Sequence, residues 1–95
     1  MSAKEGLRQK KQRSLYAIAF SRLLTELRVR RKLTQKQVAK RAKIKPLRLV
    51  RYERGIQIPV IGDLLLFGEV FRVDPVWLLD ETIRYRDQLA KNGSV

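Results

Sequence analysis

Apolar residues recur at three- and four-residue intervals along most of this chain, which is the spacing of helices that bury one face. The longest such stripe lies within residues 15–32. It consists of Tyr16, Phe20, Leu23, Leu24 and Leu27. Ser14 stands where a side chain can cap the first turn, and four cations lie near the other end, where the helix dipole favours positive charge. The pattern predicts a helix over residues 15–32.

Two shorter helices are predicted next, separated by a three-residue link. Thr34 is a natural N-cap for the first of them. Its expected inward face consists of Val38, Ala39 and Ala42. Pro46 stands at the first position of the second helix, where the missing N–H of proline is no loss. We expect Leu49 and Tyr52 to point inward, and Gly55 to end this helix in a left-handed conformation.

Two more helices are predicted after Gly55. Pro59 is expected to open the first, in which Gly68 allows another helix to cross closely. The expected buried stripe consists of Ile61, Leu64, Leu65 and Phe71. Asp74 and Pro75 provide a cap and a first-turn proline for a short fifth helix. Its apolar residues are Trp77, Leu78 and Leu79.

No segment alternates in the manner of a strand, so the predicted fold class is all-α, a compact bundle of five helices. Residues 1–14 are basic and nearly devoid of apolar side chains, which predicts a flexible N-terminal arm. Residues 15–80 form the predicted folded domain. Residues 81–95 have thin apolar content and are expected to be a C-terminal tail or helix.

Positive charge is concentrated in the first part of the chain. Residues 1–54 hold 18 of the 22 Lys and Arg and 3 of the 9 Asp and Glu, a net charge of +15. Residues 55–95 hold 4 and 6, a net charge of −2. Such asymmetry indicates that the first half faces a polyanion and that the second half does something else.

The composition argues against several kinds of protein. The chain has no Cys and no His, so disulfides and thiolate metal sites are excluded, and the commonest general base and metal ligand are missing. No glycine-rich phosphate loop is present, so we expect neither enzymatic activity nor a cofactor or metal. No apolar run approaches the roughly 20 residues of a membrane span, and no signal peptide is evident. A soluble, cytoplasmic, nucleoid-associated protein is expected.

Two short helices joined by a three-residue turn, the second one basic, describe a helix-turn-helix, whose second helix can enter a major groove about 12 Å wide. The stretch TQKQVAKRAKIKPLRLVRYERG, residues 34–55, resembles the signature of the lambda Cro/repressor-like (XRE-type) helix-turn-helix domains. The residues that carry the resemblance are Gln35, Val38, Ala39, Ile44, Leu49, Glu53, Arg54 and Gly55, and downstream Pro59, Leu64, Leu65, Phe71, Val73, Asp74, Pro75, Trp77, Leu78 and Leu79. The resemblance covers about residues 20–80 and implies a lambda-repressor-like fold that binds DNA.

The resemblance also implies roles for individual positions. Contacts to DNA bases would come from Lys45, Pro46, Leu47, Arg48, Val50 and Arg51. Contacts to phosphates would come from Gln35, Lys36, Lys43 and Arg54, and from Lys10, Lys11 and Arg13 of the arm. Arg28 and Glu53 would form a structural ion pair.

Three positions depart from the family pattern. Lys43 and Arg72 stand where glycine is usual, so a left-handed backbone at either position would be strained. Lys45 stands where Ser or Thr usually caps the recognition helix, which forfeits a cap worth about 1 kcal/mol.

Three apolar residues on the predicted recognition helix, Pro46, Leu47 and Val50, leave two interpretations open. They can pack on thymine methyl groups in the groove, or they can form a patch for a partner protein. The surrounding cations favour thymine. Arg51 is the better candidate for guanine, because arginine bidentate to guanine is the commonest specific contact.

The predicted function is therefore a double-stranded DNA-binding transcriptional regulator of phage or bacterial type. A dimer or partner surface is predicted at Val60, Leu66, Val70 and Trp77. A dimer would require a pseudo-palindromic operator with half-sites about 34 Å apart. The resemblance also bears on the direction of regulation, because some members of that family activate transcription through acidic residues on the first helix of the motif. QKQVAKRAK contains no acid, which favours repression. Two alternatives stay open, an antitoxin that also binds a small protein such as a toxin, and a sequence-neutral nucleic-acid binder.

Overall fold

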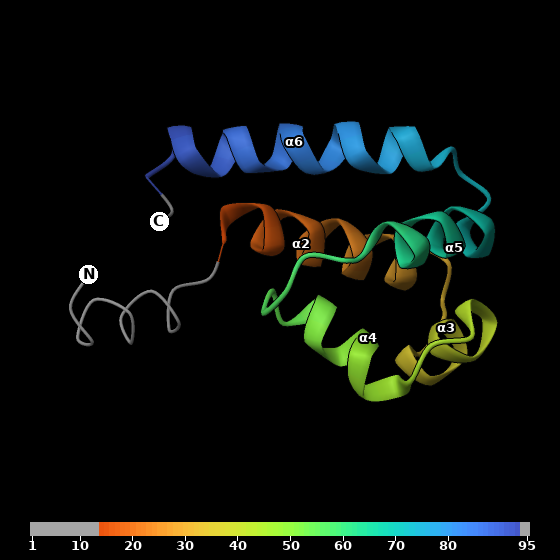
Figure 1. The fold of residues 1–95 in the computed structure, drawn as a ribbon. Helices are drawn as coiled ribbons and strands as arrows, with labels where there is room; N and C mark the ends of the chain where they lie inside the picture. Colours follow the sequence, from red (N-terminus) through yellow and green to blue (C-terminus); the bar gives the residue numbers. More distant parts are fainter. Residues whose placement is uncertain (1–13, 94–95) are drawn as a thin grey trace.

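Five helices account for most of residues 14–93, the part of the chain that the computed structural model describes (Figure 1). They are α2 (Leu15–Arg30), α3 (Gln35–Ala42), α4 (Pro46–Glu53), α5 (Ile61–Phe71) and α6 (Pro75–Lys91). No strand occurs within these residues, so the predicted all-α fold is confirmed. The predicted arm lies outside the described residues except for Ser14, and with it lie the candidate phosphate contacts Lys10, Lys11 and Arg13.

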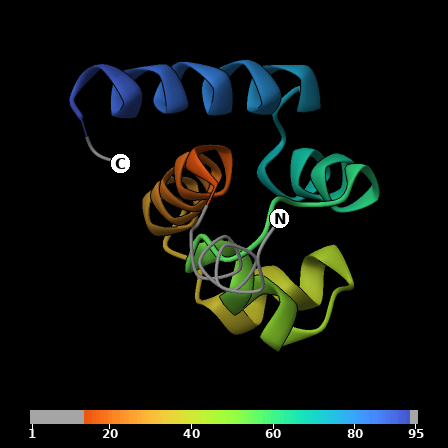
Figure 2. The ribbon, with the colours of Figure 1, turned by 60° about the vertical axis from the view of Figure 1, so that its left-hand side comes forward.

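α2 is the central helix of the bundle. α6 runs along one side of it, and the α3–α4 pair lies on the opposite side (Figures 1 and 2). α2 packs chiefly against α6 and α4, whereas α5 packs against α3 and α6. A helix with neighbours on two sides must bury a wide face. The buried residues of α2 are Ala17, Ala19, Phe20, Ser21, Leu23, Leu24 and Leu27.

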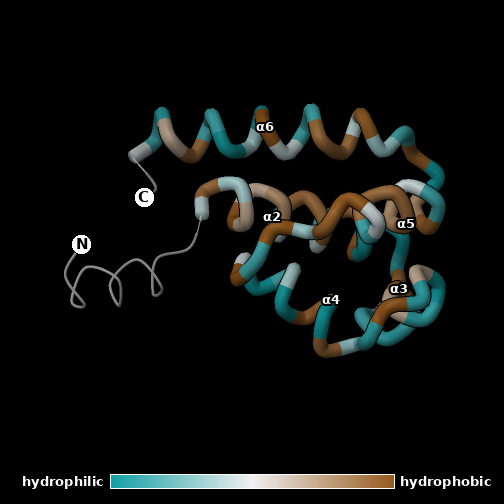
Figure 3. The backbone as a smooth tube through the Cα atoms, viewed as in Figure 1, coloured by the Kyte–Doolittle hydropathy of each residue, from teal (hydrophilic) through white to brown (hydrophobic). Residues whose placement is uncertain are grey.

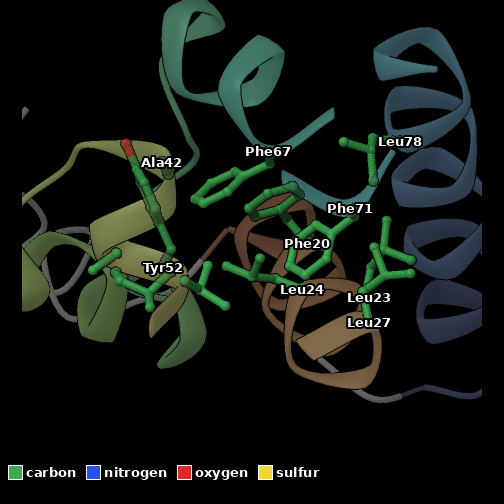
Figure 4. Packing of buried hydrophobic residues seen from close by; sticks show 12 residues of the cluster. Phe20, Leu23, Leu24, Leu27, Ala42, Tyr52, Phe67, Phe71 and Leu78 are labelled. Atoms are coloured by element: carbon green, nitrogen blue, oxygen red, sulfur yellow. The ribbon is translucent and has the colours of Figure 1, made fainter. Parts of the chain in front are cut away.

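Aromatic rings form the centre of the core (Figure 4). The Phe67 ring centroid lies 5.9 Å from the centroids of both Phe20 and Tyr52, and the latter two rings meet edge to face at 6.3 Å. The other buried members of this cluster are Leu23, Leu24, Leu27, Val38, Ala39, Ala42, Leu49, Phe71 and Leu78. The inward faces predicted for α3 and α4 are thereby confirmed, as is that of α2 apart from Tyr16. The Tyr16 side chain is exposed, and the Arg86 guanidinium lies over its ring at 4.9 Å.

The helix starts follow the predicted capping chemistry. The Ser14 hydroxyl accepts a hydrogen bond from the backbone N–H of Tyr16, and the Asp74 carboxylate accepts one from Val76. Thr34 and Gln37 form a reciprocal capping box at α3. These side chains satisfy N–H groups that have no partner within their own helices.

Four of the turns between helices place a residue in the left-handed region. Gly55 has φ of 69°, as predicted, and it satisfies this requirement without strain. Lys43 and Arg72 adopt φ of 58° and 55°, so the strain expected at these two substituted positions is present. Lys32, which follows α2, adopts φ of 56° in the same way and was not anticipated.

α5 differs from its prediction in both start and orientation. The helix begins at Ile61 after the N-cap Val60, so Pro59 precedes the helix rather than opening it. Ile61 is 75% exposed and Leu65 is 51% exposed, although both were expected inside. Phe67 is buried in their place, because its ring fills the space between Phe20 and Tyr52.

α6 is longer than the short fifth helix that the sequence predicts. It continues without a break to Lys91 and packs against α2 (Figure 1). Leu89 is buried near its end, and the Tyr85 hydroxyl donates a 2.7 Å hydrogen bond to the Glu26 carboxylate of α2. These two contacts explain why a segment of thin apolar content stays helical.

Hydropathy differs between the helices, with α5 largely hydrophobic and α3 largely hydrophilic (Figure 3). This contrast matches the shift in charge between the two halves of the chain. Within residues 14–93, no helix is long and apolar enough to cross a membrane.

Two glycines of α5 provide a matched test of the packing against α6. A Cβ at Gly68 would lie 3.0 Å from the Val73 carbonyl oxygen and 3.2 Å from Cδ of Pro75, whereas a Cβ at Gly62 would meet nothing within 4 Å. We expect Gly68→Ala to lower the free energy of unfolding by about 1–3 kcal/mol. Gly62→Ala should raise it by about 0.4–1 kcal/mol. Urea unfolding of both variants measures the difference, and equal effects would contradict a close contact at Gly68.

Candidate nucleic-acid interface

α3 and α4 form a hairpin of two helices joined by the turn of residues 43–45. Ile44 is half-buried against the core at this turn, and its N–H donates a 3.0 Å hydrogen bond to the Ala39 carbonyl. α4 buries Leu49 and Tyr52 completely. Since one face of α4 is anchored in the core, its opposite face is turned outward.

The outward face of α4 mixes apolar and cationic side chains. Pro46, Leu47 and Arg51 are exposed, with Leu47 at 60%, and Val50 is half-buried. Exposed cations continue over α3, the turn and the end of α4. They are Lys36, Lys40, Arg41, Lys43, Lys45 and Arg54. The hairpin therefore presents a basic surface that contains a small apolar centre.

A buried carboxylate fixes the hairpin to α2. Both Glu53 oxygens accept hydrogen bonds from Arg28, at 2.7 Å from Nε and 3.0 Å from Nη2, and the Glu53 side chain is only 5% exposed. The Gln35 side-chain amide donates to the same carboxylate at 3.1 Å, and Arg28 also donates to the Leu33 carbonyl. The structure thus contains the Arg28–Glu53 ion pair. Gln35, a predicted phosphate contact, commits one of its two amide N–H groups to it.

A second polar cluster joins α4 to α5. Nε of Arg48 lies 2.7 Å from the Asp63 carboxylate of α5 and 3.1 Å from the Tyr52 hydroxyl. The same hydroxyl donates a 2.5 Å hydrogen bond to Asp63. Asp63 is 6% exposed and Tyr52 is fully buried, so Arg48 reaches inward from the surface to a covered carboxylate.

The protonation states in this cluster follow from its geometry. Burial, together with the hydrogen bond to Asp63, raises the pKa of the Tyr52 phenol above its usual value. The contact with Tyr52 and the charge of Asp63 raise the pKa of the Arg48 guanidinium. At neutral pH the phenol therefore stays a donor and the guanidinium stays charged.

Comparison with known proteins agrees with this geometry. A helix-turn-helix domain family profile matches residues 19–78, well over half of the chain. The chain belongs to the helix-turn-helix domain family. The crystal structure of the clp gene regulator ClgR from Corynebacterium glutamicum has the same fold, with a TM-score of 0.76 and 18% sequence identity over 87% of this chain and 88% of that one. No curated protein sequence matches this chain.

The resemblance inferred from the sequence is therefore confirmed at the level of the helix-turn-helix family. The residue roles that the resemblance implies are a separate matter. Lys45, Pro46, Leu47 and Arg51 are all exposed on this hairpin. Arg48, in contrast, is engaged with Asp63 in the helix-turn-helix domain itself. The partner of Arg48 was missed in the sequence, where its signal was an acid, Asp63, inside an otherwise apolar run.

Only some of the residues predicted for self-association are exposed in this helix-turn-helix domain. Leu66 and Val70 are half-buried and pack against the core, whereas Val60 and Trp77 are exposed at 53% and 40%. A cavity of about 380 Å³ opens between the 56–60 loop, α5 and α6. We call the exposed aliphatic residues at this opening the apolar surface. They are Ile58, Ile61, Leu65, Val76 and Leu79.

Two ion pairs of different burial test how firmly the hairpin is attached. Glu53→Ala leaves the covered Arg28 guanidinium without its partner, and we expect a loss of about 3–5 kcal/mol in the free energy of unfolding. Arg30→Ala breaks the exposed pair with Glu26, in which Arg30 is 74% exposed, and it should cost only about 0.3–0.5 kcal/mol. Thermal or urea unfolding provides the comparison. Similar losses for the two variants would show that the buried pair contributes no more than a surface pair.

Proposed function

We propose that this helix-turn-helix protein binds double-stranded DNA at specific sequences and regulates transcription, with α4 in the major groove. The observation that supports this most strongly is the outward face of α4, where exposed Arg51 stands one helical turn after exposed Leu47. The groove floor offers a partner to each, since guanine presents two acceptors and thymine presents a methyl group. Exposed cations on either side of this face suit the flanking phosphates.

The proposal assigns a role to each side chain of the interface. Arg51 reads guanine, and Pro46, Leu47 and Val50 pack on thymine methyl groups, with Lys45 at the entrance of the helix. Phosphates are bound by Gln35, through its second amide N–H, and by cations near the turn. The cations are Lys36, Lys43 and Arg54. Arm residues Lys10, Lys11 and Arg13 add sequence-independent attraction.

Repression by occlusion is the proposed mode of regulation. Relatives that activate transcription contact polymerase through acidic side chains on the first helix of the motif, and α3 contains none over Gln35–Ala42. Its exposed side chains are Lys36, Gln37, Lys40 and Arg41, which suit DNA. Blocking a promoter by occupying it requires no such contact.

A second copy of the chain is the proposed partner of the apolar surface. Contiguous exposed apolar patches usually mark an interaction site. The surface belongs to the half of the chain with a net charge of −2, so two copies can meet there without bringing their +15 halves together. Ile61 lines the cavity and is 75% exposed, and a two-fold interface needs a self-complementary surface, which an exposed side chain next to a hollow can provide. Such a dimer would bind a pseudo-palindromic operator.

Selection of genomic DNA fragments on the purified protein at near-physiological salt tests the proposed function. We expect enrichment of a pseudo-palindrome whose half-sites are about 34 Å apart. Arg51→Gln should lose about 1–3 kcal/mol of discrimination at one position in each half-site. Lys36→Gln is the matched control, which should weaken binding to all sequences alike and lower the salt slope by about one unit. Binding that vanishes as salt rises, with no enriched sequence, would contradict the proposal.

Sedimentation equilibrium without DNA tests the dimer separately. Leu65→Asp places a charge in the apolar surface and should convert a dimer of the wild-type chain into a monomer. Val29→Asp makes the same change at a valine of α2 that is 58% exposed and lies outside this surface, so it should leave the dimer intact. Equal effects of the two substitutions, or a wild-type chain that stays monomeric even on operator DNA, would exclude this interface and leave DNA recognition untouched.

A further inference from the structure

The Arg48 side chain is held by polar contacts within the protein, whereas the Arg51 side chain is not. The Arg48 Nε lies 2.7 Å from the Asp63 carboxylate, as an ion pair, and donates a hydrogen bond to the Tyr52 hydroxyl, which in turn donates to Asp63. Within residues 14–93, Arg51 makes no side-chain hydrogen bond or ion pair and is exposed. The two arginines of α4 are therefore in different situations.

Withdrawing Arg48 to contact a base would leave Asp63 short of a partner. A carboxylate that is 6% exposed has little water to replace a lost cation, and a buried charge without its counter-ion is strongly destabilising. The Tyr52 hydroxyl alone supplies one hydrogen bond. Base reading by Arg48 would thus oppose the stability of the fold, whereas base reading by Arg51 would not.

The first turn of α4 is the part of the helix that needs the contact between Arg48 and Asp63. Its N-cap, Lys45, makes no side-chain hydrogen bond to the helix, and the turn before it contains the left-handed Lys43. Arg48 is the third residue of α4, so it acts on that first turn. α4 packs chiefly on α2 and α3, and the link from Arg48 to Asp63 joins it to the start of α5.

We infer that Arg48 is a positioning residue, which together with Asp63 and Tyr52 fixes the orientation of the α4 N-terminus, and that base reading by arginine falls to Arg51. The inference rests on the proposed DNA-binding function. It adds to that function a distinction between the side chains that contact bases and the cluster that orients α4. Asp63 is buried and anionic, so it cannot contact DNA itself, and any effect it has on recognition must pass through Arg48 and α4.

The test compares the affinity for the selected operator with that for a scrambled duplex, well below the melting temperature. We expect Arg48→Gln and Asp63→Asn each to lower this ratio about tenfold, and the double variant to lower it no further, because both substitutions break one cluster. Tyr52→Phe keeps the ring in the core and should cause a smaller loss in the same direction. Circular dichroism verifies that each variant is folded, and if the first two are not, Tyr52→Phe decides the outcome.

Several results would overturn the inference. Removing the charge of Asp63 raises the net charge by one, so a purely electrostatic effect would tighten binding to both duplexes and leave the ratio unchanged. An Arg48→Gln variant that changes the preferred base at one position, while Asp63→Asn keeps the wild-type preference, would make Arg48 a base reader. If the wild-type chain prefers no sequence, the proposed function fails. The cluster is then judged by the unfolding of Arg48→Gln, Asp63→Asn and the double variant. A loss in the double variant equal to the sum of the two single losses would refute it.

Discussion

The buried carboxylate of Glu53 is the interaction on which the arrangement of the first three helices depends. It belongs to α4 and accepts hydrogen bonds from Arg28 of α2 and Gln35 of α3. Apolar packing is not directional, so it cannot by itself fix how one helix is turned against another. The bidentate guanidinium is directional, since its two N–H groups must meet both carboxylate oxygens. Glu53 therefore converts a packed helix into an oriented one.

The polar residues at the two ends of α4 are placed against the preference of the helix itself. A helix dipole favours anions in the first turn and cations in the last. α4 has Arg48 in its first turn and Glu53 as its last residue. Both are explained by partners on other helices, Asp63 and Arg28. The helix is short and would be marginal in isolation, so its tertiary contacts override its local electrostatics.

Periodicity predicts a helix well when only one of its faces is apolar. This condition holds for α2, α3 and α4, and their inward faces were assigned correctly, with Tyr16 as the exception. α5 is apolar on most sides, so its sequence could not distinguish the face containing Phe67 from the face containing Ile61 and Leu65. The packing of aromatic rings around Phe67 determines which face of α5 is buried. In α6, the burial of Leu89 and the hydrogen bond from Tyr85 to Glu26 support a helix that is longer than the sequence indicated.

The candidate site, like the fold, could be predicted from the sequence only in part. The resemblance to a family implied the Arg28–Glu53 pair and the outward face of α4. The link between Arg48 and Asp63 joins residues on different helices, and no periodic pattern relates two such positions. Only the isolated acid among apolar residues signalled that it needed a partner.

The left-handed residues Lys32, Lys43 and Arg72 have a consequence for how this chain can change. Each stands in a turn that follows a helix, at a backbone conformation that glycine would adopt without strain. Each also supplies a positive charge to the end of a helix, which the dipole favours. Replacing any of them by glycine would relieve the backbone and remove a cation from a protein that attracts a polyanion. At Lys43, which is the one of these three residues that is proposed to contact phosphate, selection for a more stable fold and selection for tighter binding act in opposite directions.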